Sequence, residues 1–112
     1  MAKVIRKITQ FRPKEIDSLW KKARRVVKHN GLHLLKAPRS GDIGRILMVI
    51  PKRVGNAPVR NKLRRQIRHI FYETNLFKGD ADWIVIARPG AHEIPFATLQ
   101  DLFAQAASSK TA

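Results

Sequence analysis

Five basic side chains lie within nine residues of the stretch VGNAPVRNKLRRQIRHIF, which covers residues 54–71. No aspartate or glutamate occurs between Arg45 and Glu73 to balance them. A surface helix normally mixes charges of both signs, because opposite charges three or four residues apart stabilise it. Four of the five cations are arginines, whose planar guanidinium groups bind phosphate oxygens through two hydrogen bonds at once. The stretch therefore predicts a binding surface for a polyanion such as a nucleic acid. The five residues are Arg60, Lys62, Arg64, Arg65 and Arg68.

A helix over 57–73 would position these side chains on one surface. Asn56 or Ala57 stands where a helix cap is favoured, and Pro58 suits a first turn. At about 100° per residue, the arginines and Asn61 fall within an arc of about 140°, and Lys62 falls outside it. The apolar residues gather on the opposite side of the same helix. They are Val59, Leu63, Ile67, Ile70 and Phe71.

The composition also favours a polyanion as the partner. The chain has 112 residues and carries 23 Lys and Arg against 8 Asp and Glu, a formal net charge of +15. The absence of cysteine excludes disulfides and thiolate metal sites. The N-terminal segment lacks the apolar region of a secretory signal, and no apolar run approaches the roughly 20 residues needed to cross a bilayer. We therefore expect a cytoplasmic protein. An anionic membrane surface is the second candidate partner for such a charge, but the predominance of arginine over lysine on 57–73 favours structured RNA or DNA, so we expect no membrane partner.

The remaining elements follow from hydrophobic periodicity and turn residues. The pattern predicts an α+β fold in the order α-β-β-α-β-α, with a further short strand near Val26, and helices packed on a small, mostly antiparallel sheet. One parallel crossover would surround the basic helix. The segments RILMVI and WIVIA are apolar at nearly every position, as in strands buried on both faces. We expect one RNA-binding domain over 1–112, with a loosely structured basic arm at 1–12 and a frayed tail at 108–112. The expected helices are 13–23, 57–73 and 96–107, and the expected strands are 31–37, 45–50 and 83–87.

No combination of residues indicates catalysis by the protein itself. His29 and His33 have the i, i+4 spacing of a helical metal pair, but Gly31 between them and the expected strand argue against it. Turn formation accounts for Asp80 and Asp82, which precede a strand. We therefore assign no catalytic residue and no metal ligand to the chain. We expect its aromatic residues to be mostly core, with Trp20 the exception as a candidate surface for stacking.

The segment KRVGNAPVRNKLRRQIRHIF resembles the signature of the protein subunit of bacterial ribonuclease P. The chain departs from that pattern at Lys62, where the family usually has arginine, and at Pro51 and Pro58. In the first helix, Ile16 and Trp20 stand where the family tends to have phenylalanines. The resemblance extends from the first helix through DWIVIARPG to the last helix. The matching residues are Lys52, Arg53, Gly55, Ala57, Arg60, Asn61, Arg64, Arg65 and Arg68.

The resemblance implies a division of labour between protein and RNA. A large catalytic RNA would cleave precursor tRNA with Mg²⁺ held mainly by that RNA, and one protein monomer would assist it. A cleft between the first helix and the sheet would hold the 5′ leader, with Ile16, Trp20 and Leu34 as candidates. The crossover around the basic helix would be left-handed. The residues expected to bind the catalytic RNA are Lys52, Arg53, Arg60, Asn61, Lys62, Arg64, Arg65 and Arg68.

Two other readings agree with the charge and the element order. A ribosomal protein of similar α+β build would also bind structured RNA, without any role in cleavage. An independent protein nuclease would cleave precursor tRNA with no RNA subunit.

Overall fold

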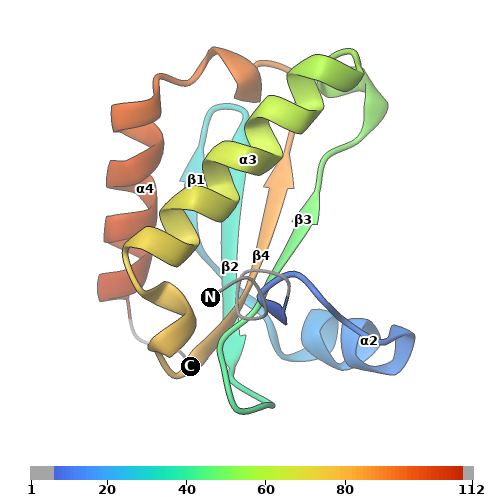
Figure 1. Cartoon of the computed structure of the whole chain (residues 1–112), viewed down its shortest axis with the longest axis vertical. Coiled ribbons are helices and arrows are strands. Elements are labelled where there is room, and N and C mark those ends of the chain that lie inside the picture. The colour runs from blue at the N-terminus through green and yellow to red at the C-terminus, as the bar shows by residue number, and fades with distance from the viewer. Residues whose placement is uncertain (1–6, 110–112) are drawn as a thin grey trace.

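The elements of the computed structural model, which describes residues 7–109, follow the expected order (Figure 1). The additional strand near Val26 is present, so the order is α-β-β-β-α-β-α. Three single-turn 3-10 helices connect these elements: η1 (Lys52–Val54), η2 (Leu76–Lys78) and η3 (Ala91–Glu93). The main elements are α2 (Pro13–Lys22), β1 (Arg24–His29), β2 (Leu32–Pro38), β3 (Ile46–Val49), α3 (Ala57–Glu73), β4 (Ala81–Ala87) and α4 (Phe96–Ser108).

The strands form one sheet in the order β1-β2-β4-β3. The pairs β1/β2 and β2/β4 are antiparallel, and β3/β4 is parallel. Asn30 and Gly31 make the turn between β1 and β2, and Gly31 has φ +88°, a conformation that glycine adopts without strain. In Figure 1, α3 crosses in front of the sheet and leads from β3 to β4 on its left. This is a left-handed crossover, the hand that the resemblance implied and one that is rare among parallel connections.

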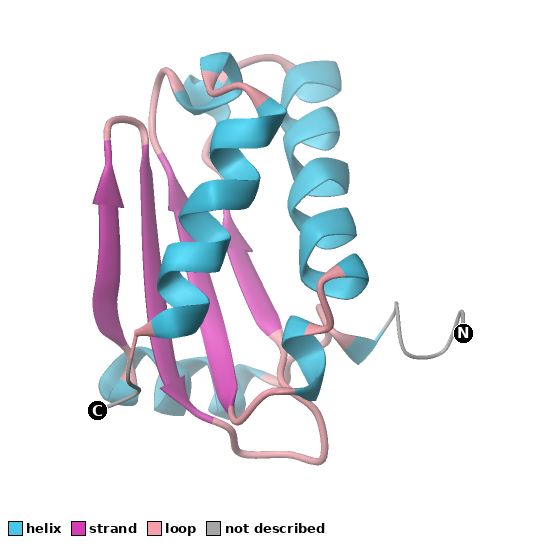
Figure 2. Ribbon diagram, turned by 90° about the vertical axis from the view of Figure 1, so that its left-hand side faces the viewer, coloured by secondary structure: helices cyan, strands magenta, loops and turns pink. Residues whose placement is uncertain are grey.

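α3 and α4 cover one face of the sheet and enclose the main core with it (Figure 2). The ring of Trp83 lies at the centre of this core. Phe71 from α3 meets it edge-on with 6.0 Å between ring centroids, and Phe103 from α4 stacks on it at 5.7 Å. These aromatic residues are buried, as expected from their spacing.

Lys36 of β2 ties the sheet to the end of α4. Its side chain is buried, and Nζ donates to the carbonyl oxygens of Ala106 at 3.0 Å and Ser109 at 2.8 Å. The ammonium group also lies 5.2 Å from the centre of the Trp83 ring. A cation here adds a second donor to the Ala106 carbonyl, which already accepts from the Ser109 amide, and suits the negative end of the helix dipole. Burial lowers the pKa of Lys36.

The opposite face of the sheet is only partly covered. α2 packs over one end of it through Leu19, which contacts Ala37 and Ile84 in a second, smaller core. Four aliphatic side chains on this face remain half-buried, and we call the surface that they form the open face. They are Leu35, Leu47, Val49 and Ile86.

Three expectations are wrong in detail. β3 is an edge strand, and only Ile46 of its residues is buried, so the strand is not enclosed on both faces. The loosely structured arm does not extend through residues 7–12, because Ile8 is fully buried and its carbonyl accepts a hydrogen bond from the Ile46 amide at 2.7 Å. Residues 1–6 of the expected arm, and 110–112 of the expected tail, lie outside the described residues. Ser108 is still helical.

Candidate nucleic-acid interface

α3 has the two-sided character expected from its sequence. The Asn56 side chain caps the helix by accepting from the Val59 amide at 3.1 Å, and Pro58 lies in the first turn. The apolar side faces the core, because Leu63, Ile67, Ile70 and Phe71 are buried and Val59 is half-buried. The basic side chains are thereby held on the outer surface of a helix that is fixed to the sheet.

Within the described residues, no carboxylate forms an ion pair with the basic side of α3. Asn61, Lys62 and Arg65 are exposed, and the arginines at 60, 64 and 68 are half-buried. Among the described residues, the ion pairs are Arg45–Glu15 and His92–Glu93, and neither involves α3. The guanidinium of Arg64 instead donates to Asn61 Oδ1 at 3.0 Å. These cations are therefore available to a ligand, and the exposed amide of Asn61 lies among them.

Close packing at the start of α3 explains Gly55. A Cβ atom at this position would lie 2.6 Å from Val59 Cγ1, which is closer than two carbon atoms can approach. The Gly55 carbonyl accepts a hydrogen bond from Arg60 Nε at 3.1 Å and thereby orients that guanidinium. Lys52 and Arg53 are exposed in η1, immediately before this turn. The turn thus joins the two basic segments into one surface.

The first helix and the open face form a second candidate surface. Trp20 on α2 is 41% exposed, the one large hydrophobic side chain with this degree of exposure among the described residues. Ile16 on the same helix is half-buried. The exposure of Trp20 agrees with its expected role as a stacking surface, and that role itself stays a prediction.

The expectation that Leu34 lines this surface is wrong. Its side chain is fully buried in the core beneath α3 and α4, on the opposite face of the sheet from α2. Successive side chains of a strand point to opposite faces, so its neighbour Leu35 lies on the open face. Leu35 therefore replaces Leu34 as the candidate residue on β2.

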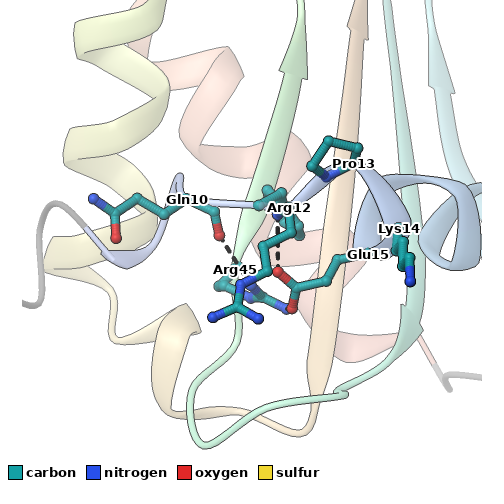
Figure 3. A pocket seen from close by; sticks show the side chains of 7 residues that line it. Gln10, Arg12, Pro13, Lys14, Glu15 and Arg45 are labelled. Atoms are coloured by element: carbon teal, nitrogen blue, oxygen red, sulfur yellow. Dashed lines mark hydrogen bonds and ion pairs between the residues drawn. The ribbon is translucent and has the colours of Figure 1, made fainter.

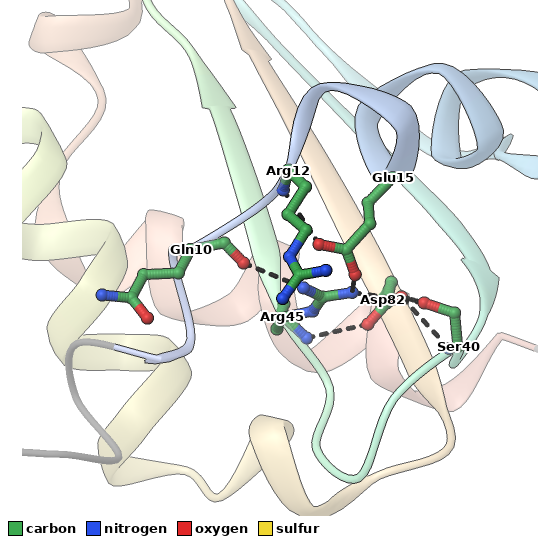
Figure 4. Close-up of polar contacts among 6 residues, drawn as sticks. All are labelled: Gln10, Arg12, Glu15, Ser40, Arg45 and Asp82. Carbon is green, nitrogen blue, oxygen red and sulfur yellow. Dashed lines mark hydrogen bonds and ion pairs between the residues drawn. The ribbon is translucent and has the colours of Figure 1, made fainter.

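Arg45 holds the segment that leads into α2 (Figures 3 and 4). No local pattern in the sequence indicates this role. Its Nη2 lies 2.7 Å from Glu15 Oε2, its Nη1 donates to the Gln10 carbonyl at 2.9 Å, and its Nη2 also donates to Ser40 Oγ at 3.2 Å. The guanidinium carbon lies 4.5 Å from the centre of the Phe11 ring. Residues 10–15 and Arg45 line an open pocket of about 950 Å³ at this place (Figure 3).

The two carboxylates beside Arg45 are already engaged in structural contacts. Glu15 accepts from the Arg12 amide at 2.8 Å, and the hydrogen bond from Arg45 lowers the pKa of this carboxyl to about 2. Asp82 is buried and accepts from the Arg45 amide at 2.9 Å and from the Ser40 hydroxyl at 3.2 Å. Glu15 and Asp82 come from segments far apart in the sequence, so only the folded chain shows that both hold Arg45, which contacts α2 through Glu15.

The histidine pair does not form a metal site. His33 lies opposite Lys28 on the face of the sheet that carries Leu35, and His29 lies one position further along β1, facing the other way. Within residues 7–109, no three His, Asp or Glu side chains lie together as metal ligands. No helix in that range is both long enough and apolar enough to span a bilayer.

The family of the chain follows from comparison with known proteins. A sequence model of the family Ribonuclease P matches residues 6–110. The chain belongs to the ribonuclease P protein family. The match covers both candidate surfaces, and the resemblance read from α3 and its preceding turn is confirmed.

Individual ribonuclease P proteins agree with this assignment. The ribonuclease P protein component of Bacillus pumilus is 36% identical over 81 residues, which cover 68% of this chain and 67% of that protein. The Streptococcus mutans component is 39% identical over 56 residues, which cover 50% of this chain and 47% of that protein. The chain thus spans about half the length of the streptococcal relatives that it matches.

Solved ribonuclease P proteins share the fold. The Staphylococcus aureus protein superimposes with a TM-score of 0.73 at 24% identity, covering 88% of this chain and 91% of that protein. The Thermotoga maritima protein, determined in complex with 1-(4-fluorophenyl)-2-thiourea, gives 0.73 at 21% identity and covers 90% of this chain and 100% of that protein. The expected α+β fold is confirmed.

Proposed function

We propose that the protein is the RNA-binding subunit of a ribonuclease P that removes the 5′ leader from precursor tRNA in the cytoplasm. The basic side of α3, with Lys52 and Arg53 beside it, binds the catalytic RNA. The supporting observation is a row of arginines, held on a fixed helix, with no carboxylate of residues 7–109 paired to any of them. Because each neutralised phosphate releases counterions, the affinity for RNA falls steeply with salt. An affinity that does not change with salt would contradict this assignment.

The open face and α2 hold the 5′ leader. Half-exposed aliphatic residues of the sheet offer a floor against which unpaired bases can lie, and Trp20 offers a ring on which one base can stack. The contacts of Arg45 with Glu15 and Gln10 keep α2 in place at the end of that floor. In this arrangement, the two RNA-binding surfaces use opposite faces of the sheet.

The chemistry belongs to the catalytic RNA. Mg²⁺ is assigned mainly to the RNA subunit, as the resemblance to the family implies. The carboxylates Glu15 and Asp82 serve the fold, through Arg45 and backbone amides, rather than a reacting group. The protein acts as one monomer per RNA by binding and orienting substrate.

Reconstitution tests the proposal. The full chain is mixed with a bacterial ribonuclease P RNA at low Mg²⁺, and release of the 5′ leader is measured. We expect the chain to stimulate cleavage, and a variant with glutamine at both Arg64 and Arg65 to stimulate it much less. Absence of stimulation would refute the proposal. Cleavage by the protein without RNA would instead indicate an independent nuclease, and copurification with ribosomal RNA would indicate a ribosomal protein.

A further inference from the structure

A second cluster of cations lies on the open face, away from α3. Lys28 of β1 lies directly opposite His33 of β2, and Arg25 lies opposite Leu35, so these side chains share one face of the sheet. That face is the open one, because Leu35 belongs to it. The half-buried His33 ring is therefore bordered by two exposed basic residues of the neighbouring strand.

Arg88 completes the cluster from the far end of β4. Arg88 immediately follows β4, which ends at Ala87, and continues the alternation of Ile84 and Ile86, which lie on the open face. The Arg88 amide donates to the Gly31 carbonyl at 2.9 Å, which holds this residue beside the β1–β2 turn and next to His33. The charges that act on the His33 ring are those of Arg88, Arg25 and Lys28, and all three are positive.

The cluster lacks a counter-charge, as α3 does. None of the three permanent cations takes part in an ion pair within the described part of the chain. Three like charges around a half-buried imidazole repel one another, and the repulsion remains until an anion arrives. Lys28, His33 and Arg88 lie at the turn end of the open face, and Arg25, opposite Leu35, lies nearer the end that α2 covers through Leu19 and Ala37. A single strand that lies along the aliphatic floor from α2 would bring its backbone to this corner.

We propose that Arg25, Lys28, His33 and Arg88 form a phosphate-binding corner that takes a backbone phosphate of the single-stranded 5′ leader. This inference rests on the proposed function and adds to it a defined anion site, in which one residue, His33, can gain a proton. Three cations fix the phosphate at any physiological pH. His33 adds a further charge-assisted hydrogen bond when its ring is protonated.

The free protein and the complex differ in the protonation of His33. Burial lowers the pKa of the imidazole below its usual 6.5, and the charges of Arg88, Arg25 and Lys28 lower it further. A bound phosphate supplies the opposite charge and raises that pKa again. At a pH between the His33 pKa of the free protein and that of the complex, leader binding is therefore accompanied by the uptake of a proton. Leader affinity increases as the pH falls through this interval, by at most about tenfold per pH unit for one proton.

The test compares substrates and variants in the reconstituted holoenzyme between about pH 6 and about pH 8. Dissociation constants are measured for precursor tRNA with a leader of about eight nucleotides and for mature tRNA, which has none. We expect the leader-bearing substrate alone to bind several-fold more tightly at the lower pH. His33→Gln abolishes this difference. The matched control His92→Gln, at an exposed histidine in η3, keeps it.

Two further measurements make the result decisive. NMR titration of the His33 ring in the full chain, with and without a single-stranded oligoribonucleotide of the leader sequence, is expected to show a higher pKa in the complex. Lys28→Gln is expected to weaken leader binding and to reduce its salt dependence by about one phosphate contact.

The outcomes separate this inference from the function on which it rests. An unchanged His33 pKa, or a pH response that survives His33→Gln, would refute the corner while leader removal continued to be stimulated. An equal pH dependence of the dissociation constant with mature tRNA would show that the bound phosphate belongs to the catalytic RNA and would refute the proposal that it belongs to the leader. Loss of all stimulation in the wild-type protein would refute the proposed function itself.

Discussion

Arg45 Nη2 and Glu15 Oε2 meet at 2.7 Å across 30 residues of sequence. Arg45 immediately precedes β3, and Glu15 lies in the first turn of α2 (Figure 4). The contact therefore joins an edge of the sheet to the helix that carries Trp20. We expect it to act on the leader surface through the position of α2 rather than by touching RNA.

The pairing of Glu15 with Arg45 predicts a defined loss of stability in acid. Because the pKa of Glu15 is lowered from 4.5 to about 2, its contribution is complete above 4.5 and is lost as the pH falls towards 2. Urea unfolding of the wild type and of Glu15→Gln, measured across this interval, checks the prediction. The variant is less stable at neutral pH, and the difference between the two proteins shrinks in acid. A difference that stays constant with pH would show that the ion pair does not stabilise the fold.

Leucines 34 and 35 should separate stability from leader binding. Leu34→Ala removes a fully buried side chain from the main core and costs about 2–5 kcal/mol of unfolding free energy. Leu35→Ala removes a half-buried side chain from the open face and costs about 1 kcal/mol, and it weakens binding of leader-bearing substrate. Chemical denaturation and binding assays on both variants check this. A leader defect confined to Leu34→Ala would overturn the assignment of the two faces.

The basic residues of α3 should contribute unequally to RNA affinity. Arg64→Ala or Arg68→Ala removes a guanidinium from the proposed interface and lowers affinity for the catalytic RNA by roughly tenfold, with a salt dependence reduced by about one contact. Lys62→Ala costs less, because this exposed side chain lies outside the arginine arc. Filter binding at several salt concentrations measures the three variants, with thermal unfolding as the control for folding. Equal losses would show that the interface extends around the helix to Lys62.

Gly55 and Val59 should be coupled. Gly55→Ala places a methyl group against the Val59 side chain and destabilises the start of α3 by about 1–3 kcal/mol. Val59→Ala in the same chain removes the closest contact, with Val59 Cγ1, and leaves Cβ at 3.0 Å, so the double variant is more stable than the sum of the two single changes predicts. A thermodynamic cycle on the four proteins measures the coupling. If the changes in unfolding free energy were strictly additive, contact with Val59 would not be the reason for glycine at position 55.

The sequence was sufficient where the signal lies within one element. The apolar stripe of α3 and its outward arginines depend on residues three and four apart, so the periodicity alone predicts them. The aromatic residues around Trp83 were also expected to be core for this reason.

The features that the sequence could not predict depend on contacts between residues that are far apart in the chain. In the segment LHLLKA, Leu34 and Leu35 are both apolar, and only the packing of the sheet under α3 and α4 determines which one is buried. The edge position of β3 depends on β4, which follows it by more than 30 residues. The phosphate-binding corner likewise combines residues of β1 and β2 with Arg88, which follows β4, and no local pattern joins Arg25 to Arg88.

The strand order also has a consequence for the chain during its synthesis. β4 lies between β2 and β3 and is made after both of them, so β3 and α3 leave the ribosome before there is a strand for β3 to pair with or a complete sheet for α3 to cover. During that interval, the apolar side of α3 is uncovered and its arginines are already present, in a compartment crowded with RNA. The left-handed connection closes only when β4 arrives, and Lys36 reaches its carbonyl partners only when the end of α4 has emerged. The fold of the nascent protein is thus completed by β4 and α4, rather than by α3, the helix that we propose binds RNA.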